Sequence, residues 1–166
     1  MKSWGFGIAA FLFLLSQSLA HAEPQLWQVP ASGKPTLMET LQAAQSGDTI
    51  EVNGGLHSGS FVIEKSLHLV GKNHATLDGK NSGTVVILNA PDIHISGFHI
   101  TGTGTSLQSE NSGIAAKAPR ALIENNQLEN VLFGISLSQA HQSVVRQNTI
   151  RGKPLTLPLR GDPIRV

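Results

Sequence analysis

Two histidines occupy the same place in successive copies of a short pattern. His68 and His94 each lie between two aliphatic residues, in the sequences LHL (67–69) and IHI (93–95), 26 residues apart. Neighbouring side chains of a strand point to opposite faces, so both imidazoles are expected to point outward if the aliphatic residues point inward. If the two segments pair as strands, the rings lie within about 5 Å of each other. Imidazoles at that spacing can bind copper or zinc, and we predict a metal site at His68 and His94. The alternative is two polar residues that face solvent.

Other histidines are predicted as unpaired surface residues: His57, His99 and His141.

The carboxylates provide little for catalysis. A sugar hydrolase needs two Asp or Glu residues at a defined separation, but Asp78, Asp92, Glu124 and Glu129 align with no other carboxylate across the repeats. An acidic calcium cluster beside basic residues and a glycine-rich phosphate loop are also missing from the sequence. We therefore predict no catalytic residues, no cofactor-binding residues and no enzymatic activity. The scattered basic residues are predicted to form a solvated face: Lys117, Arg120 and Arg146.

The elements that must position the two histidines are repeated strands. One pattern occurs at residues 93–102, 121–130 and 143–152, and an earlier copy occupies residues 67–79. Repeats of roughly 20–45 residues indicate stacked units that bury their apolar faces against each other. Apolar residues two apart within each copy indicate strands and not helices.

Stacking the copies in register predicts an all-β fold, a right-handed parallel β-helix. Its handedness follows the general rule for parallel crossovers. A second series of strands begins at Gly113, Gly134 and Gly161, so each turn holds at least two short strands. The predicted internal ladders are Ile95, Ile123 and Val145; Ile100, Leu128 and Ile150; and Ile114, Ile135 and Ile164. Asn126 and Asn148 occupy equivalent corners, where they either hydrogen-bond along the axis or perform ordinary turn chemistry.

The N-terminal residues 1–22 have the features of a cleaved secretory signal peptide. Lys2 supplies a positive charge, residues 5–15 are apolar, and residues 20–22 (AHA) fit the cleavage pattern. The apolar stretch is short for a bilayer span, so an uncleaved anchor is the less favoured alternative. We expect an exported, soluble mature chain.

The mature chain is predicted to contain three parts. Residues 23–35 are rich in proline and polar residues and are predicted as a linker or extended lead-in. Residues 36–47 are predicted as an N-terminal capping helix, because Thr36 and Glu39 form a capping box. Residues 48–166 form the β-helix, which is expected to be incomplete at its C-terminus because the last strand has no cap after it.

Composition excludes several classes of function. Removing Lys2 leaves 11 basic and 11 acidic side chains, so no excess positive charge is available for nucleic acid. The sequence has no cysteine, which excludes disulfides and thiolate ligands. Tyrosine is absent and Trp27 is the one tryptophan outside residues 1–22, so an aromatic platform for sugars is poorly provided for.

Two groups of segments resemble known families. The opening of the repeat region resembles CASH-type right-handed β-helices, a group of carbohydrate-binding proteins and sugar hydrolases, in residues 46–52, 59–65, 67–71 and 75–79. The later part is similar to the NosD family, in residues 120–126, 130–137, 146–152 and 160–162. Pro163 departs from this pattern, in which glycine is expected, but proline is tolerated at the first residue of a strand.

The resemblance to NosD implies a function. Members of that family are periplasmic accessory proteins in copper-centre maturation of nitrous oxide reductase, in denitrification. They act with an ABC-type membrane protein and its ATPase, so these two proteins and the reductase are the expected partners, with copper as a transient cargo. The resemblance also implies a longer protein, of which residues 36–166 match the N-terminal part. Two alternatives stay open: a carbohydrate-active β-helix enzyme or polysaccharide-binding module, and a structural scaffold that binds protein partners.

Overall fold

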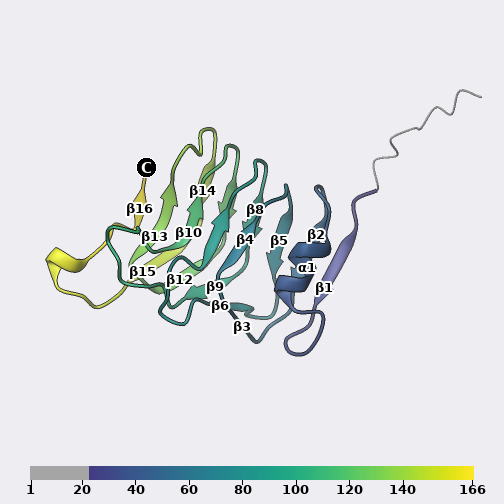
Figure 1. Ribbon diagram of the computed structural model, residues 1–166, viewed down its shortest axis with the longest axis horizontal. Helices are drawn as coiled ribbons and strands as arrows, with labels where there is room; N and C mark the ends of the chain where they lie inside the picture. The colour runs from purple at the N-terminus through teal and green to yellow at the C-terminus, as the bar shows by residue number, and fades with distance from the viewer. Residues whose placement is uncertain (1–22) are drawn as a thin grey trace, which may run out of the picture.

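Short strands and tight corners wind into a coil in the computed structural model, which describes residues 23–166 (Figure 1). The predicted signal peptide, residues 1–22, lies outside the described part of the chain and stays a prediction. Strands from successive turns lie side by side in parallel, and they form one six-stranded and two five-stranded sheets. The predicted parallel β-helix is therefore confirmed.

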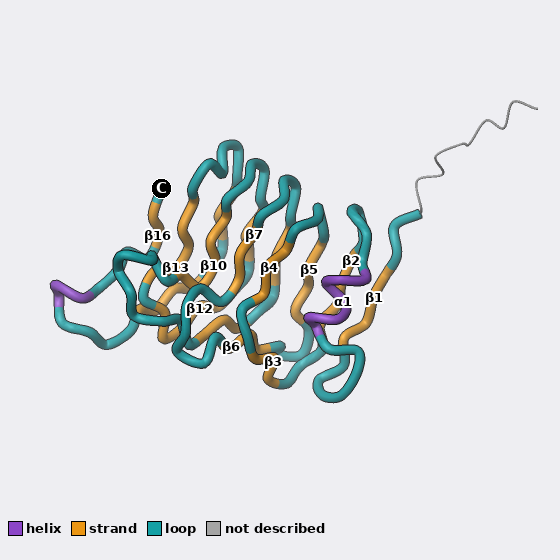
Figure 2. Tube along the Cα trace, viewed as in Figure 1, coloured by secondary structure: helices purple, strands orange, loops and turns teal. Residues whose placement is uncertain are grey.

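Each full turn passes through the three sheets in the order A, B, C (Figure 2). Sheet A contains β1 (Leu26–Val29), β2 (Thr49–Val52), β5 (His68–Gly71), β8 (His94–Ser96), β11 (Leu122–Glu124) and β14 (Val144–Arg146). Sheet B contains β3 (Leu56–Ser58), β6 (Thr76–Asp78), β9 (His99–Thr101), β12 (Gln127–Val131) and β15 (Thr149–Gly152). Sheet C contains β4 (Phe61–Ile63), β7 (Val86–Leu88), β10 (Ser112–Ala116), β13 (Phe133–Leu137) and β16 (Ile164–Arg165). A short 3₁₀ helix, η1 (Leu157–Leu159), precedes β16.

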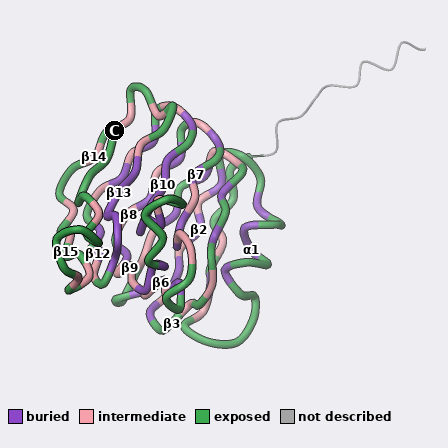
Figure 3. Tube along the Cα trace, turned by 60° about the vertical axis from the view of Figure 1, so that its left-hand side comes forward, coloured by how far each residue is buried: buried purple, intermediate pink, exposed green. Residues whose placement is uncertain are grey.

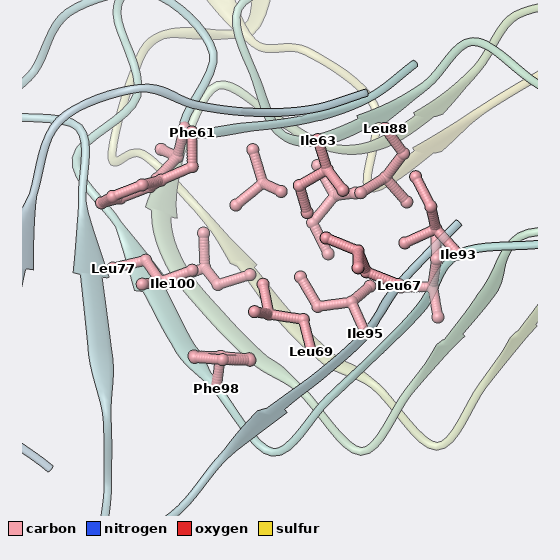
Figure 4. Packing of buried hydrophobic residues seen from close by; sticks show 14 of the residues in the cluster. Phe61, Ile63, Leu67, Leu69, Leu77, Leu88, Ile93, Ile95, Phe98 and Ile100 are labelled. Carbon is pink, nitrogen blue, oxygen red and sulfur yellow. The ribbon is translucent and has the colours of Figure 1, made fainter. Parts of the chain in front are cut away.

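The core consists of aliphatic ladders that run along the axis of the coil. Figure 4 shows Leu69 and Ile95 from sheet A and Leu77 and Ile100 from sheet B among the packed side chains. The three predicted ladders are confirmed by the strand registers: Ile95, Ile123 and Val145; Ile100, Leu128 and Ile150; and Ile114, Ile135 and Ile164. Alternation with a period of two directs these side chains toward the axis of the coil, because a one-residue shift would turn the whole strand outward.

The segment predicted as a linker, residues 23–35, contains a strand. Within it, β1 pairs in parallel with β2, and Val29 is fully buried. The backbone N–H of Thr49 donates to the carbonyl of Gln25, and that of Asn53 donates to the carbonyl of Val29. Of the two predicted possibilities, a linker or an extended lead-in, the strand agrees with the extended lead-in. The edge of β2 needs a partner for its backbone groups, and the composition of residues 23–35 does not indicate that β1 supplies it.

The predicted helix is present as α1 (Leu37–Ala43), a little shorter than residues 36–47. Its capping box is confirmed: the Thr36 side chain accepts from the backbone N–H of Glu39, and the Glu39 carboxylate accepts from that of Thr36. Leu37 and Leu41 are buried. Lys65, just after β4, donates to the carbonyls of Leu41, Gln42 and Ala44 at the helix C-terminus. The helix thus lies near the start of sheet C, between β1 and β2 in the chain.

Burial decreases toward the last turn of the coil (Figure 3). Ile95 and Ile123 are fully buried, whereas Val145 in the same ladder is half-buried and Ile164 in sheet C is 47% exposed. Among residues 23–166, no helix has the length and apolar character needed to cross a membrane.

Candidate functional site

The predicted histidine pair lies on the outer face of sheet A. His68 on β5 and His94 on β8 are register partners, and the adjacent Leu69 and Ile95 form the next pair and point into the core. The centroids of the two imidazole rings are 5.6 Å apart, and the ring planes meet at 69°. His68 is exposed and His94 is half-buried. The predicted juxtaposition of the two rings is therefore confirmed, whereas their role in metal binding stays a prediction.

Glu124 on β11 extends this arrangement into the next turn. Its register partner is Ser96, but its side chain reaches diagonally to His94, and the two atoms Nε2 and Oε1 are 3.0 Å apart. Sequence reasoning compared Glu124 with other carboxylates and so missed this neighbour. Aligning Ile95 with Ile123 would have placed Glu124 on the outer face, beside Ser96 and two residues along from His94, which was the available indication.

Arg146 on β14 holds the other oxygen of Glu124. Arg146 Nε donates to Glu124 Oε2 over 2.6 Å, although the arginine side chain is 58% exposed. This hydrogen bond lowers the pKa of the Glu124 carboxyl below its usual range; burial opposes the shift, and the charges of Arg146 and His94 add to it. Arg146 was predicted as part of a scattered solvated face. Its side chain is exposed, and the structure in addition places it in an ordered column with Glu124 and His94.

A second column of the same residue types runs along sheet B, five residues further along the chain. His99 on β9, Glu129 on β12 and Arg151 on β15 follow one another, at 3.6 Å between His99 Nε2 and Glu129 Oε2 and 4.0 Å between Glu129 Oε1 and Arg151. This column is looser than the first, and His99 Nε2 has no hydrogen-bond partner within residues 23–166. The register partner of His99 is Thr76, so this column contains a single imidazole.

The corner between sheets A and B is hollowed on its outer side. The hollow has a volume of about 390 Å³ and is lined largely by amide, imidazole and backbone groups, including His74, His99, Asn125 and Gln147. Asp and Glu are missing from its lining among the described residues. This hollow therefore lacks the two carboxylates that a sugar hydrolase requires.

The remaining histidines do not enlarge the candidate metal site. His57 was predicted as a surface residue, but it occupies the inward position of β3 opposite Leu77, and its Nε2 lies 3.0 Å from the carbonyl oxygen of Asn53. Across residues 23–166, no group of three or more His, Cys, Asp or Glu side chains is arranged to hold a metal ion. The candidate metal site therefore stays limited to the two imidazoles of His68 and His94 on the outer face of sheet A.

Comparison with known proteins gives two related matches. The chain is 31% identical over 143 residues to a protein of Pseudomonas aeruginosa named "Probable ABC transporter binding protein NosD", across 85% of this chain and 31% of that protein. It is 26% identical over 150 residues to the protein of the same name from Stutzerimonas stutzeri, across 89% of this chain and 32% of that protein. The chain thus spans about a third of the length of these curated relatives. The predicted similarity to NosD is confirmed.

No protein-family model matches the chain, and no solved structure gives a significant match.

Proposed function

We propose that this homologue of NosD proteins is a non-enzymatic accessory protein that works in the periplasm, in the assembly of the copper centre of nitrous oxide reductase. Two observations support the proposal: the similarity to two proteins named as ABC transporter binding proteins, and the parallel β-helix itself. In this role the protein docks to an ABC-type membrane protein with its ATPase. The chain spans about a third of its relatives, so the proposal concerns the protein of which this β-helix is a part.

The observation that carries a copper role for this chain is the pairing of His68 with His94 on adjacent strands. Neutral imidazole nitrogens are good ligands for copper. The two rings project from paired positions on adjacent strands, with their centroids 5.6 Å apart, and we propose that they share one ion. An ion bound by two nitrogens on an outer face stays accessible to a partner protein. This accessibility suits a cargo that is taken up and handed on, whereas a permanent site would be closed by four ligands.

The binding experiment uses three proteins. Cu(I) and, separately, Cu(II) are titrated into the wild type, the His68→Ala/His94→Ala double variant and the His99→Ala variant. We expect the double variant to lose one binding equivalent and His99→Ala to retain it, because the residues paired with His99 on the adjacent strands are Thr76 and Gln127 and not histidines. Equal binding by the wild type and the double variant would refute the histidine site.

The cellular experiment tests the role in assembly. Nitrous oxide reductase is purified from a host that carries its maturation genes, with the full-length protein present, deleted, or replaced by the double variant. Deletion is expected to lower the copper content of the reductase, and the double variant is expected to restore it incompletely. A reductase with full copper after deletion would contradict the proposed function.

A further inference from the structure

Only one of the two paired imidazoles is held by a neighbouring side chain. His94 Nε2 lies 3.0 Å from Glu124 Oε1, and the His94 side chain is 27% exposed. Within the described chain, no carboxylate lies within salt-bridge distance of His68, which is exposed. The pair is thus asymmetric, with one oriented ring and one free ring.

The carboxylate that holds His94 is itself fixed from the other side. Arg146 occupies Glu124 Oε2, and the Glu124 side chain is 13% exposed. β11 lies between β8 and β14, so Glu124 bridges residues from three successive turns of the coil. With its second oxygen engaged by a guanidinium, the carboxylate presents Oε1 to His94 in one orientation.

An ionised carboxylate can only accept hydrogen bonds. The contact with Glu124 therefore requires a proton on Nε2 of His94, and a neutral imidazole then has its lone pair on Nδ1. We propose that Glu124 is a positioning residue that keeps the proton of His94 on Nε2 and leaves Nδ1 as the nitrogen that accepts a metal. A carboxylate that orients a ligand histidine in this way also raises the basicity of its free nitrogen.

The proton position depends on the observed contact alone, whereas the metal-binding part of the inference rests on the proposed copper function. The two parts can be measured separately. The proton position is read in the metal-free protein, and the consequence for metal binding is read by titration.

Glu124→Gln is the informative variant because it changes the hydrogen-bonding character and retains the shape. Arg146 Nε can only donate a hydrogen bond, so we expect it to donate to the carbonyl oxygen of the new amide. The NH₂ group then faces His94 Nε2, which must accept, and the proton moves to Nδ1. Glu129→Gln is the matched control, because Glu129 belongs to the looser second column and contacts His99 instead of His94.

The tautomer is measured by long-range ¹H–¹⁵N correlation NMR on ¹⁵N-labelled protein, at a pH where His94 is neutral. We expect the Nε2–H tautomer in the wild type and in Glu129→Gln, and a shift toward Nδ1–H in Glu124→Gln. An Nδ1–H tautomer in the wild type, or an unchanged tautomer in Glu124→Gln, would overturn the inference. Circular dichroism checks that each variant is folded.

Cu(I) titration then tests the link to metal binding. Loss of a partner that orients a ligand typically weakens metal binding by about 10- to 100-fold, and we expect a loss of that size in Glu124→Gln and none in Glu129→Gln. A tautomer shift with unchanged Cu(I) affinity would overturn the link. If the His68→Ala/His94→Ala variant binds Cu(I) as the wild type does while the tautomer shifts as expected, the copper function fails and the positioning role of Glu124 stands.

Discussion

Asn126 occupies the buried corner between sheets A and B, and its amide group satisfies backbone groups in the turn before it. Its Oδ1 accepts from the backbone N–H of Phe98 over 3.1 Å, and its Nδ2 donates to the carbonyl of Ile95 over 3.2 Å. Nδ2 also donates to Asn148 Oδ1 over 3.1 Å. Of the two roles left open from the sequence, hydrogen bonding along the axis is therefore confirmed for Asn126 and Asn148.

Replacing Asn126 with Asp removes both donated hydrogen bonds and places a carboxylate oxygen against two acceptor oxygens. We expect Asn126→Asp to lower the free energy of unfolding by about 1–3 kcal/mol for the unsatisfied buried groups. Asn125→Asp is the matched control, because Asn125 is exposed and aspartate also tolerates its positive φ of 55°. Urea unfolding followed by circular dichroism measures both. Equal stability of the two variants would contradict a structural role for the buried amide.

At the scale of elements, Asp48 ties β1 to the turn that follows α1. This buried carboxylate accepts hydrogen bonds from the backbone N–H groups of Gln25 and Gln45 and from the indole N–H of Trp27, each at 2.8 Å. Burial raises the pKa of Asp48, but these hydrogen bonds outweigh it, and the pKa of the Asp48 carboxyl lies below its ordinary value. The ionised carboxylate thus stabilises the N-terminal end of the coil.

The lowered pKa of Asp48 predicts a pH-dependent stability. The unfolded chain binds the proton of this carboxyl more readily than the folded chain, so the stabilisation is complete above about pH 4 and decreases as the pH falls toward the folded pKa. Asp48→Asn turns an amide N–H toward N–H donors, and we expect it to cost about 1–3 kcal/mol of unfolding free energy at pH 7. The difference in unfolding free energy between Asp48→Asn and the wild type should become smaller as the pH falls.

The measurement is urea unfolding of the wild type, Asp48→Asn and Asp162→Asn at several pH values from 7 to about 3, the lower limit lying below the ordinary aspartate pKa. Asp162 is exposed and serves as the control. A deficit in Asp48→Asn that stays constant or grows with acid would show that the charge of Asp48 does not stabilise the fold.

At the scale of the whole molecule, stability comes from one core that runs through every turn. Ile123 pairs with Ile95 on one side and Val145 on the other, so a change at this position affects three successive turns. A side chain on the outer face is not part of this shared core and contacts only the side chains next to it on the surface. Inward substitutions are therefore expected to act on the whole coil, and outward ones to act locally.

Ile123→Asp should prevent folding, because it places a charge without a partner inside a fully buried ladder. Val144→Asp provides the comparison, since Val144 is 47% exposed and points outward on the neighbouring strand. We expect this control to stay within about 0.5 kcal/mol of the wild type, as surface changes usually do. Soluble yield and circular dichroism distinguish the two, and a folded Ile123→Asp protein would contradict the assignment of this face to the core.

The sequence alone determined the inward and outward faces of the repeated strands and the register between turns. Alternation with a period of two decides which side chains are buried, and the repeat spacing decides which residues meet in the stack. These two regularities were sufficient to place Ile95 beside Ile123, Asn126 beside Asn148, and His68 beside His94.

The tertiary structure decided the contacts that do not follow from register. Glu124 reaches His94 on a diagonal, and this contact depends on side-chain rotamers and on the path of the strands. The pairing of β1 with β2 depends on the open edge of β2, to which the composition of residues 23–35 gives no clue. For these reasons the sequence placed the two histidines together, and only the structure identified the carboxylate that orients one of them.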